Sequence, residues 1–570
     1  MTTILEPRIR HPEPAAPDDA PPPPGPSVVE GQPHGAGPSL ACRAWVGAVT
    51  FGHRHAASIA VLGGLLLVTG LVHGIGMYTS PGPFDDEGTY MAQAWAVEER
   101  GTLAHYTYWY DHPPLGWLTL AAWNVLSAPF TSGDPAITAG RQAMLVVHLL
   151  SVALVYVIAR RLGIRRAVAA VAVALFSLSP LAIAYQRMIF LDNIAVLWVL
   201  VAFALALSPQ RRLWSAAAAG AAMAAAVLTK ETALVLVPAV AWQLWIAFDR
   251  RTRAFALALA ASLFGLVAAV YPLYALLKAE LLPGDDHVSL IEGVVFQLTG
   301  RVASGSIFDG GSIAFRVVGD WLRLDAWTLG LGVIVLPVAL ATRRLRAVGV
   351  ALALQLVLLL RTGYLPIPFV IALLPFAALV AAGTLDQLAG AVAGRAGRLR
   401  SRHPALPAAV GGLAMAGLVA SVALSAVPSW AAGAGRLMAD APAPMDEART
   451  WISAELPRDR RLLVDNTMWV DLVEAGFDDD LQVVWFYKLD FTNNLDPSVA
   501  SRLPGGWREF DYVVSTSSMR DSVRDSPGGL EEVRLALDRS EPVKVFGAGA
   551  DRVEVRRIDR SVPDDRGTSR

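Results

Sequence analysis

The residues best suited to chemistry stand in five short polar segments between apolar runs. They are Asp85, Asp86, Glu87 and Tyr90 in PFDDEGTY, His112 in YDHPPLGW, Arg187 and Asp192 in QRMIFLDN, Lys230 and Glu231 in LTKETA, and Arg361 and Tyr364 in RTGYLPIPF. A carboxylate whose pKa is raised by burial and by neighbouring acids can remove a proton from a hydroxyl. A lysine or arginine can stabilise an anion. Ionisable residues at membrane margins are costly and tend to pair or to line functional cavities.

The composition places these segments in a membrane protein. Of the 570 residues, 54% are hydrophobic and 17% are charged, whereas soluble proteins carry about 25% charged residues. About eleven apolar runs approach the ~20 residues that cross a hydrocarbon core about 30 Å thick. The predicted transmembrane helices cover residues 56–77, 141–159, 166–184, 193–208, 213–228, 232–247, 254–277, 326–341, 346–360, 367–383 and 406–427. We therefore expect an all-α polytopic membrane domain over residues 51–427.

Five arginine clusters indicate the orientation of these helices. The clusters are at residues 159–166, 210–212, 249–253, 342–346 and 394–402. All five lie on the cytoplasmic side, as the positive-inside rule requires, if the N-terminus is cytoplasmic and the apolar segment 114–130 lies in the outer interface without crossing. The five polar segments then share the outer face, with the longest outer loops at 78–140 and 278–325.

The two ends of the chain differ from this membrane part. Residues 1–50, which include PPPPGP, are proline-rich and polar, as is typical of a disordered tail, here cytoplasmic. Residues 428–570 carry more charge, and short strands predicted in RRLLVDN, LQVVWFY and FDYVVST are separated by predicted helices. We expect a small extracytoplasmic soluble α/β domain there. The single cysteine, Cys42, excludes an intrachain disulfide.

The order of the motifs resembles one superfamily. Asp86, Glu87 and Tyr90 form a D-E-x-x-Y pattern, HPPLG follows at 112–116, R-x-x-x-L-D lies at 187–192, and TKE lies at 229–231. Together they resemble the protein O-mannosyltransferase and aminoarabinose-transferase superfamily of polyprenyl-phosphate-dependent glycosyltransferases, which have the GT-C membrane fold, over roughly residues 56–385. The histidine of HPPLG is closer to the O-mannosyltransferase branch. The loop 278–325 is too short for a MIR domain, and the resemblance does not explain the C-terminal domain.

The resemblance implies a hexosyltransferase of the plasma membrane. It would move a sugar, mannose-like by the HPPLG motif, from a polyprenyl phosphate to an acceptor hydroxyl on the extracytoplasmic face, with inversion; protein O-glycosylation or another cell-envelope modification would be the outcome. Asp86 matches the general base of the family. Asp85 and Glu87 would tune this base, and Asp192 matches the family's second acid unless it only caps the helix that follows.

The remaining polar residues would bind the substrate. Lys230 and Arg361 are the expected cations for the departing phosphate, with Arg187 and His112 as helpers. Tyr90 and Glu231 complete the expected set. Tyr364 is included too, although an aromatic anchor in the membrane interface is the simpler interpretation of this residue.

We expect no required cofactor. The acids of DDE could bind a divalent metal, but hard cations need several oxygen ligands, and only the first loop plainly supplies them. The expected partners are a lipid-linked donor, a protein, glycan or lipid acceptor, and membrane lipid; no basic aromatic patch suggests nucleic acid. The sequence names neither the sugar nor the acceptor.

Two other functions are compatible with parts of the sequence. A secondary transporter of a polar or lipid-linked solute is the alternative, but transporters often show internal repeats with charges near the midplane, and here no repeat is visible and the charges gather at one face. A membrane anchor that presents the C-terminal domain as a binding module would leave the first-loop motifs unexplained.

Overall fold

The computed structural model describes residues 40–131, 134–284, 287–399, 405–438, 440–490, 499, 501–526 and 528–561. The disordered tail expected for residues 1–50 therefore lies largely outside the described residues. Only its last part is described, as the first turns of a helix that begins at Leu40.

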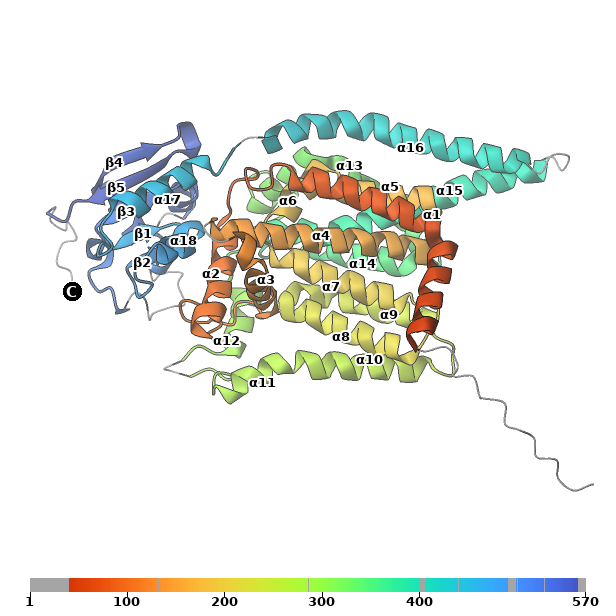
Figure 1. Cartoon of the computed structure of the whole chain (residues 1–570), viewed down its shortest axis with the longest axis horizontal. Helices are drawn as coiled ribbons and strands as arrows, with labels where there is room; N and C mark the ends of the chain where they lie inside the picture. The colour runs from red at the N-terminus through yellow and green to blue at the C-terminus, as the bar shows by residue number, and fades with distance from the viewer. Residues whose placement is uncertain are drawn as a thin grey trace, which may run out of the picture. The chain divides into compact units, whose positions relative to one another are not determined.

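The membrane part is a bundle of helices (Figure 1). Its longer helices are α1 (Leu40–Gly74), α4 (Ala136–Arg161), α13 (Ile313–Ala341), α15 (Val370–Leu399) and α16 (Ala405–Ala434). Its shorter helices are α2 (Asp85–Arg100), α3 (Leu115–Thr131), α5 (Arg166–Ser177), α6 (Pro180–Arg187), α7 (Leu191–Ala206), α8 (Leu213–Thr229), α9 (Val237–Ala247), α10 (Arg253–Ala268), α11 (Val270–Leu277), α12 (Leu290–Val295) and α14 (Arg346–Leu359). Short helical turns are η1 (Glu231–Leu236), η2 (Phe296–Gly300), η3 (Ile367–Phe369) and η4 (Gly435–Met438).

Every predicted apolar run is helical, but the number of membrane crossings stays a prediction. Among the described residues, five helices are long and apolar enough to span a bilayer, and a sixth span results if the pair α5 and α6, bent by 61°, counts as one. Helices such as α7 and α14 are apolar but only 10–17 residues long. The predicted outer loop 278–325 is partly helical, since it contains α12, η2 and the start of α13.

The segment expected to lie in the interface is α3, and it is more deeply packed than expected. Helix α3 contacts α2 and α4. Trp117 of this helix is fully buried and packs edge-on against Tyr108 at 5.9 Å. A methyl group at Gly116 would lie 2.5 Å from the Leu191 side chain, so the small residue of HPPLG allows α3 to approach α7 closely.

Several arginine clusters meet away from these outer segments. Arg165 and Arg344, from two of the clusters, both pair with Asp386 in the middle of α15, at 2.7 and 3.2 Å. Arg161, Arg211 and Arg343 line one cleft, which brings together the clusters at 159–166, 210–212 and 342–346. This grouping is the one that the positive-inside argument requires.

The C-terminal domain is built on a five-stranded sheet (Figure 1). Its elements are α17 (Ala443–Glu455), β1 (Leu462–Val464), η5 (Asn466–Met468), α18 (Trp469–Glu474), β2 (Val483–Trp485), η6 (Phe486–Lys488), η7 (Gly506–Glu509), β3 (Tyr512–Ser515), α20 (Ser517–Asp525), α21 (Glu531–Asp538), β4 (Ser540–Phe546), η8 (Gly549–Asp551) and β5 (Val553–Ile558). The strand order is β2-β1-β3-β5-β4. Strands β1, β2 and β3 run parallel, and β5 is antiparallel to both β3 and β4. The three predicted strand segments form β1, β2 and β3.

The C-terminal domain is seated directly on α2. Gly88 of α2 lies so close to η5 that a methyl group there would be 2.3 Å from the backbone nitrogen of Thr467. Next to it, the Asn466 side-chain amide donates a hydrogen bond to the Thr89 hydroxyl at 2.9 Å. A further contact joins the backbone N–H of Ala136 to the Asp471 carboxylate at 2.8 Å. These contacts fix the sheet relative to the turn that carries Asp85 and Asp86.

Candidate active site

Helix α2 begins at the three acids, and its start explains their arrangement. Phe84 is in the extended conformation, and its backbone N–H donates to the Glu87 carboxylate at 2.9 Å. Acids in the first turn of a helix are stabilised by the unpaired N–H groups and the helix dipole. Successive helical positions point in different directions, so Asp85, Asp86 and Glu87 have three different surroundings.

Glu87 is fully buried and paired. Its carboxylate accepts two hydrogen bonds from Arg141 of α4, at 3.0 and 2.9 Å, and another from the backbone N–H of Ile189 at 3.1 Å. Arg141 also donates to the carbonyl of Met77. Through this carboxylate, the first turn of α2 is joined to α4 and to the loop before α7. Glu87 therefore does not face a cavity, in contrast to the catalytic role that its place in the motif implied.

Arg187 also lies away from the candidate site. Its guanidinium donates to the carbonyls of Val72, His73 and Ile75 at the end of α1, at 2.6–3.0 Å, and to that of Ser80. A cation on these carbonyls satisfies groups that a helix end leaves without partners. The structure thus places Arg187 as a C-terminal cap of α1, and not as a helper in anion binding.

Lys230, His112 and Glu231 form a hydrogen-bonded chain. The Lys230 Nζ lies 2.8 Å from His112 Nε2, and His112 Nδ1 lies 3.0 Å from Glu231 Oε2. An ammonium group only donates, so Nε2 accepts and Nδ1 carries the proton that is donated to Glu231. His112 is held in turn through its carbonyl, which accepts from the hydroxyl of Tyr108 at 2.8 Å. These hydrogen bonds fix the position of the Lys230 ammonium group.

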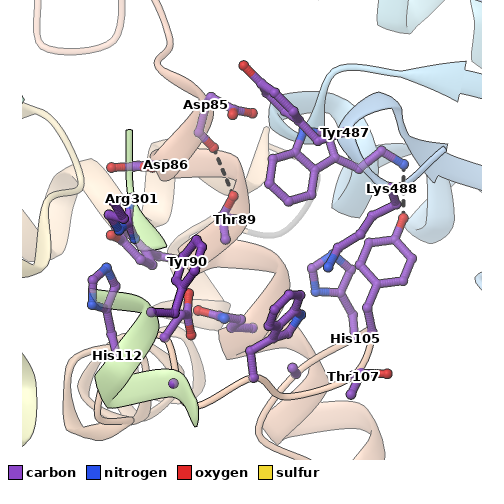
Figure 2. A pocket seen from close by; sticks show the side chains of 18 of the residues that line it. Asp85, Asp86, Thr89, Tyr90, His105, Thr107, His112, Arg301, Tyr487 and Lys488 are labelled. Carbon is purple, nitrogen blue, oxygen red and sulfur yellow. Dashed lines mark hydrogen bonds between the residues drawn. The ribbon is translucent and has the colours of Figure 1, made fainter. Parts of the chain in front are cut away.

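Two cavities meet at this place. The first, which we call the domain-side cavity, has a volume of about 450 Å³ and lies between α2, residues 104–112 and the C-terminal domain. The second, the bundle-side cavity, has about 420 Å³ and is lined by Lys230, Glu231, Arg361 and mostly apolar residues of η1, η2 and η3. The residues that line both are Asp86, His112, Arg301 and Tyr364. Figure 2 shows Asp86, Arg301 and His112 on one side of the domain-side cavity, across from Tyr487 and Lys488.

Arg301 is a site residue that the sequence reasoning missed. Its guanidinium stacks on the ring of Tyr364, 4.6 Å from the centroid, and its Nε donates to Gln297 Oε1 at 2.7 Å. Among the described residues, no acid forms an ion pair with Arg301, Lys230 or Arg361. Arg301 belongs to no spaced motif; the nearest signal is an arginine beside the apolar stretch 290–298 in an outer loop.

The remaining predicted residues fall on the two cavities or next to them. Asp85 and Tyr90 line the domain-side cavity, and Tyr364, at 37% exposure, borders both cavities beneath Arg301. Asp192 is buried in the first turn of α7. It lines a small recess with Thr232 and Gln355, so it does not reach either cavity directly.

The two free acids of the first turn have shifted protonation equilibria. Burial raises the pKa of Asp86, and the nearby cations Lys230 and Arg301 offset part of this rise. Burial also raises the pKa of Asp85 well above its usual range, and the neighbouring carboxyls of Asp465 and Asp86 raise it further. A carboxylate of raised pKa at the junction of two cavities can act as a proton acceptor.

The first-turn acids do not converge on one point as metal ligands would. Glu87 is used by Arg141, and Asp85 and Asp86 face different neighbours. In the part of the chain that the structure describes, no group of three or more His, Cys, Asp or Glu side chains could hold a metal ion. These carboxylates therefore do not fit a divalent cation as a set of ligands. That the reaction needs no metal stays a prediction.

The chain shares sequence features with one family and its fold with several solved structures. The family of dolichyl-phosphate-mannose-protein mannosyltransferases matches residues 121–282. The crystal structure of ArnT from Cupriavidus metallidurans in the apo state has a TM-score of 0.55 at 15% identity, over 88% of this chain and 98% of that one. ArnT bound to undecaprenyl phosphate gives 0.52 at 16% identity, over 90% and 100%. The Archaeoglobus fulgidus oligosaccharyltransferase in the apo form gives 0.52 at 12%, over 88% and 75%.

The comparisons agree with what the motifs predicted. None of the curated protein sequences matches the chain. The family match lies inside the range of the expected resemblance and confirms it, and the GT-C membrane fold is confirmed by the structural likeness. Members of the matched family are glycosyltransferases, so the predicted class of enzyme is confirmed by this match.

Proposed function

We propose that this chain transfers a hexose, mannose-like in view of the family that it matches, from a polyprenyl phosphate to an acceptor hydroxyl, with inversion at the anomeric carbon. The observation that carries the proposal is the meeting of two cavities of different character at Asp86, His112, Arg301 and Tyr364. A lipid-linked donor and a water-soluble acceptor group need such a junction, because the reacting atoms must come together from two different environments.

The bundle-side cavity suits the lipid-linked donor. Its walls include Leu234, Leu298 and Ile367, which are 54%, 67% and 38% exposed. Exposed apolar side chains in a membrane bundle contact hydrocarbon without cost, so a polyprenyl chain can lie along them. The cations Lys230, Arg301 and Arg361 stand in the same cavity. An amphipathic ligand with an anionic head and an apolar tail matches this distribution of charge.

The three cations would stabilise the departing phosphate. Lys230 offers a point charge whose position is fixed by His112, whereas Arg301 and Arg361 offer planar groups that can bind two phosphate oxygens at once. Cations that are positioned before the reaction stabilise developing charge without reorganisation. As the bond between the anomeric carbon and the phosphate oxygen breaks, the electron pair goes to the phosphate, whose charge these residues balance.

Asp86 is the base in this proposal. The acceptor hydroxyl would enter from the domain-side cavity, give its proton to the Asp86 carboxylate, and form the new bond to the anomeric carbon from the side opposite the phosphate. One displacement in line inverts the configuration. Asp85 lies beside Asp86 in the first turn of α2 and lines the acceptor side of the junction, and no step requires a cofactor or a metal.

The reaction would take place on the extracytoplasmic face of the plasma membrane. The grouping of arginine clusters at one cleft and the positive-inside rule support this orientation. A cysteine at exposed position 134 should react with an impermeant maleimide on intact cells, and one at exposed position 251 should not, in a chain with Cys42→Ser. The reverse labelling would contradict the orientation.

The direct test of the function is transfer by the purified chain. With mannosyl phosphoryl polyprenol as donor and envelope glycolipids or peptides as acceptors, product and free polyprenyl phosphate should appear in equal amounts. A chain that carried donor across vesicles without breaking its glycosidic bond would instead be a transporter, and that result would overturn the proposal.

A further inference from the structure

The C-terminal domain contributes one wall of the domain-side cavity. Trp485 at the end of β2 and Tyr487 in η6 line the cavity, together with Tyr106 and Trp109 of the first outer loop. Phe486, between them, is fully buried in the core of the domain. The chain leaves the strand at Trp485 and enters η6, and in this turn Phe486 faces the core while Trp485 and Tyr487 face the cavity.

The rings of this wall are partly exposed and polar groups lie between them. Trp485 and Tyr487 are half-buried, with centroids 5.3 Å apart and planes at 70°. Lys488 lies 5.2 Å from the Trp109 ring centroid and 5.3 Å from that of Tyr106, so it joins η6 to the first outer loop through cation–π contacts. Asp85 and Asp111 line the same space. The cavity therefore offers flat apolar faces beside carboxylates and hydroxyls.

The chemistry of this wall matches a saccharide. The C–H groups on the face of a sugar ring carry partial positive charge and stack on the negative faces of aromatic rings. Sugar hydroxyls donate to carboxylates and accept from N–H and O–H groups. A hydroxylated peptide would need a different kind of site, because extended peptides are commonly bound by backbone hydrogen bonds to an exposed strand edge.

At the edge of the sheet next to the cavity, the last backbone N–H of β2 is already hydrogen-bonded. Strand β2 lies at the edge of the sheet, and the backbone N–H of Trp485 donates to the Tyr106 hydroxyl at 2.9 Å. The first outer loop thus occupies the backbone donor that an added peptide strand would use, which favours recognition by side-chain faces.

We infer that the domain-side cavity is the acceptor subsite and that the acceptor is a carbohydrate, stacked on Trp485 and Tyr487 with one hydroxyl directed at Asp86. The inference rests on the proposed function and specifies its acceptor. Gly88, two residues after Asp86 on α2, contacts Asn466 and Thr467 of the domain that carries the aromatic wall, so this contact helps to set the distance between the wall and the base. The C-terminal domain then determines acceptor specificity, and the bundle binds the donor.

The inference is tested by binding, with the full chain in lipid nanodiscs that contain undecaprenyl phosphate. The probes are short oligosaccharides of mannose and of arabinofuranose, and a capped hexapeptide of alanine, serine and threonine. Saturation-transfer NMR should show contact with the ring protons of at least one saccharide and none with the peptide. Trp485→Ala and Tyr487→Ala should each weaken saccharide binding by ~10-fold or more, whereas Trp485→Phe and Tyr487→Phe should largely retain it.

The controls separate this inference from the proposed function. Trp451→Ala changes a partly buried tryptophan of the same domain that lies outside the cavity, and it should leave saccharide binding unchanged. Undecaprenyl phosphate, measured by native mass spectrometry, should remain bound in Trp485→Ala and be lost in Lys230→Ala. Peptide binding in place of saccharide binding, or saccharide binding that is indifferent to both Trp485→Ala and Tyr487→Ala, overturns the inference. Failure of the unmodified chain to retain undecaprenyl phosphate contradicts the proposed function and with it the acceptor role of the cavity.

Discussion

The ammonium nitrogen of Lys230 lies 2.8 Å from Nε2 of His112. The two residues are 118 positions apart in sequence, yet the hydrogen bond fixes the protonated side of the imidazole and directs the lysine charge into the bundle-side cavity. The two motifs HPPLG and TKE are thereby parts of one structure. In the proposed reaction, this structure binds the phosphate of the donor.

Lys230→Ala should abolish tight binding of polyprenyl phosphate, since the point charge opposite the phosphate is lost. Lys230→Arg should retain part of it, because the charge remains while the geometry changes. The measurement is retention of undecaprenyl phosphate by the purified chain. Lys278→Ala is the matched control, because Lys278 is half-exposed, pairs with Glu280 and lines neither cavity. Equal retention by Lys230→Ala and the unmodified chain would remove the lysine from the phosphate site.

Arg301→Ala should slow transfer by about 10²-fold, as expected when one preorganised group that stabilises developing charge is removed. Arg301→Lys should recover little, because a lysine cannot both stack on Tyr364 and keep the hydrogen bond to Gln297. Turnover with a saturating lipid-linked donor is the measurement. Arg316→Ala, on the exposed start of α13, serves as the control and should transfer normally. Normal transfer by Arg301→Ala would show that Lys230 and Arg361 suffice.

Glu87→Gln should destabilise the fold by roughly 3–5 kcal/mol, because it leaves the buried Arg141 guanidinium without its counter-charge. Thermal unfolding in detergent measures the effect. Glu98→Gln, at an exposed position of the same helix where the carboxylate accepts a hydrogen bond from Asn124, should change stability little. A Glu87→Gln chain with unchanged stability and lost transfer would restore the catalytic role that the motif implied.

The rate of transfer should fall as the pH is lowered through the raised pKa of Asp86, since the base must be deprotonated. Lys230 lowers this pKa, so Lys230→Ala should move the acid limb of the pH profile of the residual rate to higher pH.

The free energy of unfolding should depend on pH in the opposite sense. Asp85 has a folded-state pKa well above that of the unfolded chain, so folding takes up a proton between these values and stability rises as pH falls through that window. Asp85→Asn should flatten this dependence; a dependence that stays unchanged would mean that Asp85 is not the group that titrates.

The sequence could predict the site residues that belong to spaced motifs, and it could not predict how each one is oriented. The consecutive acids Asp86 and Glu87 are equivalent in a pattern, yet one borders both cavities and the other is buried against Arg141. The difference depends on the packing of α2 against α4, which no local pattern encodes. The same holds for Arg187, whose partners are the end carbonyls of α1.

The missing parts of the site come from long-range contacts. Arg301 is placed by its stacking on the distant Tyr364 ring, and Trp485 is brought to the cavity by a domain that docks through Gly88. The apolar runs and short strands were predictable because hydrophobic periodicity is a local property. The joining of the soluble domain to α2 was not, because a single glycine in a helix has no distinctive signal.

The central claim is that Asp86 is the base, and the most direct measurement compares Asp86→Asn with Asp85→Asn. Both substitutions keep the side-chain shape and remove a carboxylate from the first turn of α2. With purified chain and a lipid-linked sugar, transfer by Asp86→Asn should fall by roughly 10²–10⁴-fold while binding of the donor is retained, and Asp85→Asn should lose much less. Near-normal transfer by Asp86→Asn would contradict the account, and a loss confined to Asp85→Asn would assign the base to the preceding residue.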